Sequence, residues 1–122
     1  MSILTTFGDL FRGKADLSFP RRSSQWPTVR KTHLSTHGTC AVCNGTTNLE
    51  VHHIKPFHVD PTLELAPLNL ITLCEAGKDG INCHLLIGHL GNFKSVNLDV
   101  VADAAIWNTK ISNRPTDARL VE

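Results

Sequence analysis

The stretch LEVHHIKPFH, residues 49–58, carries three of the seven histidines of this 122-residue chain. Its first residues alternate in polarity and include the β-former Val51, which predicts a strand over residues 49–54 that Pro56 ends. Successive side chains of a strand point to opposite faces, so His52 and His53 diverge unless the strand ends or twists there. Because histidine titrates near neutral pH and binds metals, this pair is a candidate for proton transfer or metal ligation.

Four cysteines, Cys40, Cys43, Cys74 and Cys83, lie on both sides of this stretch. No apolar run is long enough to cross a bilayer and no secretory signal is recognisable, so we expect a cytoplasmic location, where disulfides are rare. The Cys-x-x-Cys spacing then favours a metal or redox site. Because a thioredoxin-like βαβ context is missing, a zinc site of four thiolates is the preferred interpretation. The alternative for Cys74 is a buried core thiol.

The remaining pattern predicts one α+β domain. Residues 21–38 are predicted to form a helix with Ser24 as its N-cap, and residues 97–114 a second helix. An apolar stripe marks the second helix, formed by Val100, Ala104, Trp107 and Ile111. Between them, residues 69–74 form a short strand or turn, and a short helix starts near Cys83.

Charge is unevenly distributed along the chain, although the net charge is only +1. Residues 1–39 contain six basic and two acidic residues, a net charge of +4. This region is either a solvated tail or an arm that contacts nucleic-acid phosphates, through Arg21, Arg22, Arg30 and Lys31. We predict a basic, loosely ordered leader over residues 1–22, a domain over 23–114 with its core at 40–92, and a tail over 115–122.

Four segments in a fixed order, CAVC, LEVHHIKPF, APLNLITLC and CHLLIGH, resemble the HNH endonuclease family over roughly residues 40–89. The resemblance implies a small zinc-stabilised ββα-metal core, flanked here by an N-terminal and a C-terminal helix. It also implies a metal-dependent endonuclease that hydrolyses DNA phosphodiester bonds by a single-metal mechanism with a histidine general base.

The resemblance further implies a role for each matching residue. His52 and His84 are ligands of the catalytic divalent metal, and the four cysteines bind structural zinc. The catalytic residues are His53, the general base, and Asn69, which holds the loop and helps to orient this base. His89 lies about 140° around a regular helix from His84, so it can be a further ligand only where the helix breaks or widens at Gly88. The expected catalytic ion is Mg²⁺ or Mn²⁺, with Ni²⁺, Co²⁺ and Zn²⁺ as alternatives that suit imidazole.

The implied partner is the DNA phosphate backbone, in a bacterial or phage-infected cell, with a homodimer or a larger DNA-processing complex left open. A second functional class is a zinc-stabilised nucleic-acid-binding module without catalysis. Such a module has no evident need for His52, His53, Asn69 and His84 together.

Overall fold

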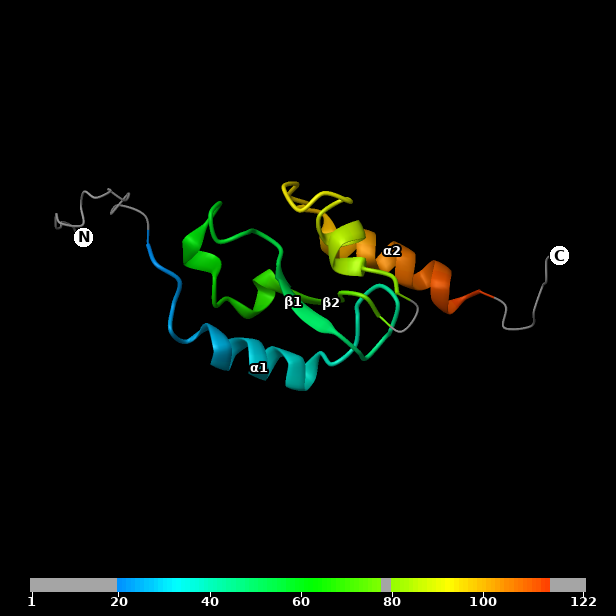
Figure 1. The fold of residues 1–122 in the computed structure, drawn as a ribbon, viewed down its shortest axis with the longest axis horizontal. Coiled ribbons are helices and arrows are strands. Elements are labelled where there is room, and N and C mark those ends of the chain that lie inside the picture. Colours follow the sequence, from blue (N-terminus) through cyan, green and yellow to red (C-terminus); the bar gives the residue numbers. More distant parts are fainter. Residues whose placement is uncertain (1–19, 78–79, 115–122) are drawn as a thin grey trace, which may run out of the picture.

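The computed structural model describes residues 20–77 and 80–114 (Figure 1). The predicted tail and most of the predicted leader therefore lie outside the described residues. The chain forms α1 (Trp26–Thr36), β1 (Leu49–His53), β2 (Leu70–Cys74), the short helix η3 (His84–Gly88) and α2 (Val100–Ser112), with single 3-10 turns η1 (Pro61–Leu63) and η2 (Pro67–Asn69) before β2. This order confirms the α+β prediction and is consistent with a ββα-metal core.

The two strands form an antiparallel sheet in which Leu49 pairs with Cys74 and His53 pairs with Leu70. All five residues of β2 are buried, whereas β1 is buried only at Val51 and His52. The ambiguous segment before Cys74 is therefore a strand, and its continuous apolar character reflects burial on both faces.

The helices lie on opposite sides of this sheet (Figure 1). Helix α1 packs against β1, η3 packs against both strands, and α2 packs against η3. The buried cluster between sheet, η3 and α2 is small and includes Val42, Leu73, Val100 and Ala104 together with three of the cysteines. A core of this size gains from a bound structural metal.

Both long helices differ in detail from their predictions. Helix α1 begins at Trp26 with Gln25 at the N-cap position, so the predicted cap at Ser24 is wrong. The hydroxyl of Ser23 accepts a hydrogen bond from the Gln25 amide at 3.0 Å and fixes a turn that delays the helix. In α2 the predicted apolar stripe is buried only at its start, since Trp107 is 46% exposed.

The predicted short helix after Cys83 is a π-helix, with His84 as its first residue and Gly88 as its last. Such widened turns are rare and frequently occur at functional sites. Among the described residues, no helix is both long and apolar enough to span a membrane.

Candidate metal centres and active site

The four cysteines, far apart in the sequence, meet at one point between the loop before β1, the end of β2 and the start of η3. Their sulfur atoms all lie within 4.8 Å of one another, and none of the four forms a disulfide. The sulfurs of Cys43 and Cys74 are 3.8 Å apart, which is the separation that tetrahedral Zn–S bonds of about 2.3 Å impose. The donor set therefore fits one zinc ion.

A tight turn shapes the first cysteine pair. The Cys40 amide donates to the Gly45 carbonyl at 2.8 Å, and Asn44 adopts a left-handed conformation with φ of 64°. Burial disfavours the Cys40 thiolate, but backbone N–H groups, among them that of Cys43, point at its sulfur and bring its pKa below the ordinary value. This turn prepares Cys40 to bind a cation as a thiolate.

The second cysteine pair joins the cluster despite its eight-residue spacer. Cys74 ends β2, and Cys83 is the N-cap of η3, so the two elements bring the thiols together. Cys74 is completely buried, as a core thiol would be, but it also contacts the sulfur of Cys43. Burial and a position suited to metal ligation thus coincide at this residue.

Three histidines form a second cluster on the side of the sheet that η3 covers. The Nε2 atom of His84 lies 3.1 Å from Nδ1 of His52 and 3.2 Å from Nε2 of His89. An ion bound at about 2.0–2.1 Å separates neighbouring nitrogens by about 2.9–3.4 Å, depending on its coordination number. We name His52, His84 and His89 the histidine trio.

Outer hydrogen bonds decide where the lone pairs of His84 and His89 point. His84 donates its Nδ1–H to the Glu75 carboxylate at 2.8 Å, and His89 donates its Nδ1–H to the Ser95 carbonyl at 3.0 Å. Neutral imidazole has one donor and one acceptor nitrogen, so both Nε2 atoms direct lone pairs at each other. Two facing lone pairs repel unless a cation lies between them, and the trio therefore fits a divalent metal.

Burial and the neighbouring ring charges also keep His52 neutral. Burial is the main cause that lowers its pKa, to about 3, and His84 and His89 lower it further. A metal ligand must be unprotonated, so this environment suits ligation.

The widened helix explains how His89 reaches the trio. The π-helix His84–Gly88 brings residues five apart onto nearly the same face, which a regular α-helix does not. Gly88 leaves the room this needs, because an added Cβ would lie 3.0 Å from Leu73 and 3.3 Å from the ring of His52. The condition stated from the sequence, widening at Gly88, is met.

His53 lies outside the trio, as strand alternation predicts. Its Nε2 is 2.8 Å from the Glu64 carbonyl oxygen, and its ring packs on Trp26 with centroids 4.5 Å apart. A carbonyl only accepts, so Nε2 carries the proton and Nδ1 carries the free lone pair. Burial lowers the pKa of His53, and the charge of Arg22 lowers it too. His53 is therefore neutral near pH 7 and able to accept a proton at Nδ1.

Asn69 acts on the loop around His53 rather than on its ring. Its side chain accepts from the Lys55 amide at 2.8 Å and donates to the carbonyls of Lys55 and Leu63 at 3.0 and 3.1 Å. Leu63 directly precedes Glu64, whose carbonyl binds His53. Asn69 is thus a positioning residue that fixes both ends of the loop between the strands.

The four predicted phosphate contacts have different surroundings. Arg21, Arg22 and Lys31 are exposed. Arg22 packs over the Phe57 ring at 4.5 Å and lies 3.8 Å from the buried Glu64 carboxylate, which places it on the His53 side. Arg30 instead contacts the Glu50 carboxylate and the Leu49 carbonyl, each at 3.3 Å, and links α1 to β1.

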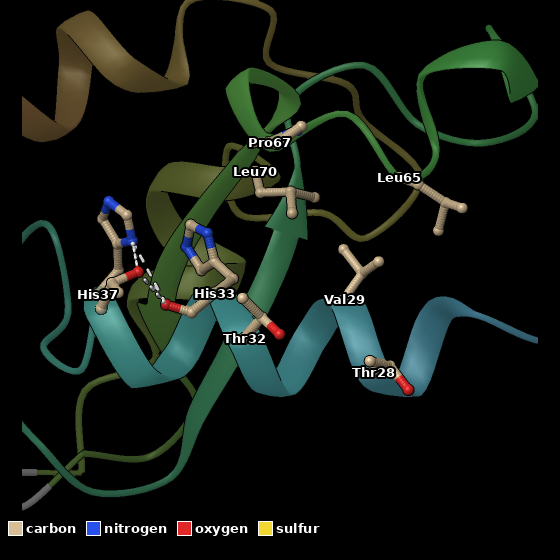
Figure 2. A pocket seen from close by; sticks show the side chains of 9 residues that line it. Thr28, Val29, Thr32, His33, His37, Leu65, Pro67 and Leu70 are labelled. Carbon is tan, nitrogen blue, oxygen red and sulfur yellow. Dashed lines mark hydrogen bonds between the residues drawn. The ribbon is translucent and has the colours of Figure 1, made fainter.

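A pocket of about 260 Å³ lies between α1 and the segment around η2 (Figure 2). Val29, His33 and Leu70 line it, and His33 stacks on His37 with ring centroids 4.4 Å apart. No member of either metal cluster lines this pocket. His33 is buried, so it serves the packing of α1 rather than the candidate site.

Glu75, Glu64 and Ser95 were not predicted as site residues. Two of them contribute backbone carbonyls, which a sequence does not mark. The sequence did hold a signal for the contact between Glu75 and His84. Glu75 directly follows Cys74 and His84 directly follows Cys83, so a shared cysteine site would bring the two residues near each other.

Residues 40–88 match the family described as HNH endonuclease. The match confirms the resemblance predicted from the sequence and includes all four cysteines, His52, His53, Asn69 and His84. Residues 40–88 are thus similar to a nuclease-type family. No curated protein and no solved structure gave a match to the chain.

Proposed function

We propose that this protein is a metal-dependent endonuclease that hydrolyses DNA phosphodiester bonds. The observation that carries the proposal is the pairing of a metal-binding trio with a separately held neutral base. The Nε2 atom of His84 lies 3.1 Å from His52 Nδ1 and 3.2 Å from His89 Nε2, while His53 is fixed by the Glu64 carbonyl at the adjoining end of β1.

His53 is the general base in this proposal. Its Nδ1 takes a proton from a water molecule, whose oxygen then forms a bond to phosphorus as the bond to the leaving sugar oxygen breaks. The Glu64 carbonyl stabilises the imidazolium that forms, because the ring keeps its Nε2–H hydrogen bond throughout. The histidine trio would hold a divalent cation, which would supply Lewis-acid stabilisation of the negative charge that develops in this step.

The donor set bears on the choice of catalytic ion. Three imidazole nitrogens suit Zn²⁺, Ni²⁺ or Co²⁺ better than Mg²⁺, which prefers oxygen ligands. We therefore place these ions, with Mn²⁺, ahead of Mg²⁺, which the sequence had placed first. The cysteine cluster, with its four soft thiolates, is assigned to structural Zn²⁺.

DNA is the proposed partner, contacted through its phosphates. Arg22 is the strongest candidate contact, because it is 58% exposed and its charge reaches His53. Arg21 and Lys31 stay predicted contacts, whereas Arg30 must first leave Glu50. Such contacts give salt-dependent binding with little sequence preference.

The test compares wild type with His53→Ala on supercoiled plasmid, with Ni²⁺, Mn²⁺ or Mg²⁺ and with EDTA. We expect metal-dependent nicking by the wild type only, with DNA and metal binding retained in the variant. His58→Ala is the matched control, since His58 is an exposed histidine of the following loop. If wild type and His53→Ala bind DNA equally but neither cuts with any metal, the protein is a zinc-stabilised binding module instead.

A further inference from the structure

Two hydrogen-bonded residues, Glu75 and His84, connect the two metal clusters. The Glu75 carboxylate accepts from His84 Nδ1 at 2.8 Å. Each residue directly follows a cysteine of the zinc cluster, since the chain reads Cys74-Glu75 and Cys83-His84. The two backbones that carry this pair are therefore adjacent to the two sulfurs that the cluster holds together.

Further backbone contacts fix both residues. The Glu75 amide donates to the Asn48 carbonyl at 2.7 Å, which ties it to the turn before β1. The Asn82 side chain accepts a hydrogen bond from the amide of Leu85, the residue after His84, at 2.9 Å. The chain is thus held by hydrogen bonds at Glu75 and directly after His84, the two residues whose side chains meet.

The pair is not explained by stability. The Glu75 side chain is 39% exposed, and ion pairs with such exposure contribute little to folding. Glu50, which faces Arg30 at 3.3 Å with 42% exposure, is a comparable pair without a metal ligand. The distinguishing property of Glu75 is the direction that it gives to the His84 ring.

We propose that Glu75 is a positioning residue for the histidine trio: its carboxylate holds the proton of His84 on Nδ1 and aims the Nε2 lone pair at the metal. This inference rests on the proposed function only in that the trio binds a metal. An ionised carboxylate can only accept, so it selects the Nδ1–H tautomer, and it also makes the imidazole a stronger donor to a cation. Nothing in the family match assigns such a role to a residue after the third cysteine.

The test measures the Ni²⁺ affinity of the zinc-loaded protein, with one zinc per chain, by titration calorimetry. It compares wild type with Glu75→Gln and Glu75→Ala, and Glu50→Gln is the control. We expect Glu75→Ala to weaken binding roughly 10- to 100-fold. Glu75→Gln should lose less, because its amide oxygen still accepts from His84. Glu50→Gln should bind as the wild type does.

Nitrogen-15 NMR of His84 without Ni²⁺ gives a second readout that a merely structural role would not change. Wild type should show the Nδ1–H tautomer, and Glu75→Gln a mixture of both tautomers. Unchanged Ni²⁺ affinity in both folded variants, or an unchanged tautomer in Glu75→Gln, overturns the proposal. If Glu75→Ala does not retain zinc, its Ni²⁺ affinity is not interpreted. The tautomer of His84 in Glu75→Gln then decides whether Glu75 positions the ring.

The two proposals can fail separately, because these measurements use no DNA. A wild type that binds Ni²⁺ and depends on Glu75 but never cuts DNA overturns the nuclease and leaves the role of Glu75. If the wild type cuts DNA but Glu75→Ala binds Ni²⁺ with wild-type affinity, the role of Glu75 is overturned and the nuclease proposal stands.

Discussion

The Nε2 atoms of His84 and His89 lie 3.2 Å apart although five residues separate them in the chain. In a regular α-helix this spacing turns the two side chains about 140° away from each other. The π-helix His84–Gly88 removes that angle by adding one residue to the turn. The local distortion of the helix is thus what brings a third nitrogen into the histidine trio.

His89 should contribute as a ligand and not only as a neighbour. We expect His89→Ala to lower the affinity for Ni²⁺ at least tenfold, since one of three ring nitrogens is removed and the ion is held only by the other two. Zinc content at the cysteines should stay at one ion per chain. Titration calorimetry and elemental analysis check both, with the exposed His58→Ala as control. Equal Ni²⁺ affinity in His89→Ala and wild type would remove His89 from the site.

Gly88 should be intolerant of a side chain. An added Cβ would lie 3.0 Å from Leu73 and 3.3 Å from the rings of His52 and His84, so in Gly88→Ala these side chains must shift by a few tenths of an ångström. We expect weaker Ni²⁺ binding and a lower melting temperature. Gly38→Ala is the control, because its Cβ would meet only the Leu34 carbonyl oxygen, at 3.3 Å, and no member of the histidine trio. A Gly88→Ala protein with wild-type Ni²⁺ affinity contradicts the tight packing seen here.

The cysteine cluster should hold one zinc that the fold requires. Cys74→Ser is expected to lose the ion and to unfold at much lower temperature, because binding of a structural zinc is coupled to folding. Elemental analysis and thermal denaturation measure the two effects. Thr39→Ser, an exposed neighbour of Cys40, should change neither. Folded wild-type protein that contains no zinc after purification in reducing buffer would refute the assignment.

The predictable part of the site is the part that side-chain identity and spacing specify. The spacing of the cysteines predicts the thiolate cluster from sequence. The roles of His52 and His84 came from the resemblance to the HNH family. The π-helix is different, since it depends on how η3 packs against β1 and β2 around Gly88. From the spacing alone, His89 can join His84 only if the helix breaks or widens at Gly88. The spacing could not predict whether the helix does so.

The partners that orient the histidines were also beyond sequence reasoning. The Glu64 carbonyl that binds His53 lies eleven residues along the chain and is a backbone group. Its position depends on the loop that Asn69 ties at Lys55 and Leu63. Such contacts depend on the backbone conformation of the loop. The three prolines of the loop restrict this conformation but do not determine it.

Asn69 should be needed for both stability and base positioning. Asn69→Ala removes three hydrogen bonds from the buried loop junction, and each buried group left unpaired costs about 1–3 kcal/mol. Asn69→Asp keeps the contact to the Lys55 amide but sets a carboxylate oxygen against two carbonyls. Urea denaturation should show both variants destabilised, and plasmid nicking should fall. Leu68→Ala, at a 95% exposed neighbour, is the control. Wild-type stability in Asn69→Ala would show that water replaces the amide.

His33 should make the fold sensitive to acid independently of the metal sites. Burial lowers its pKa, with a further contribution from His37, and its Nε2 is buried without a hydrogen-bond partner. Apart from His33 itself, only His37 is titratable among the residues lining the pockets at this interface. Below about pH 6.5 the unfolded chain takes up a proton that folded His33 resists, so stability falls as pH falls.

The measurement compares urea denaturation of wild type and His33→Leu at pH 7.5 and pH 5.0. Protonation of the metal ligands affects both proteins alike, so the difference between their unfolding free energies isolates His33. We expect the wild type to lose more stability than His33→Leu over this interval. Replacement of the exposed His37 by Ala should leave most of the acid sensitivity in place, because burial of His33 is its main cause. Parallel losses in wild type and His33→Leu would show that His33 is protonated as readily in the folded state as in the unfolded one.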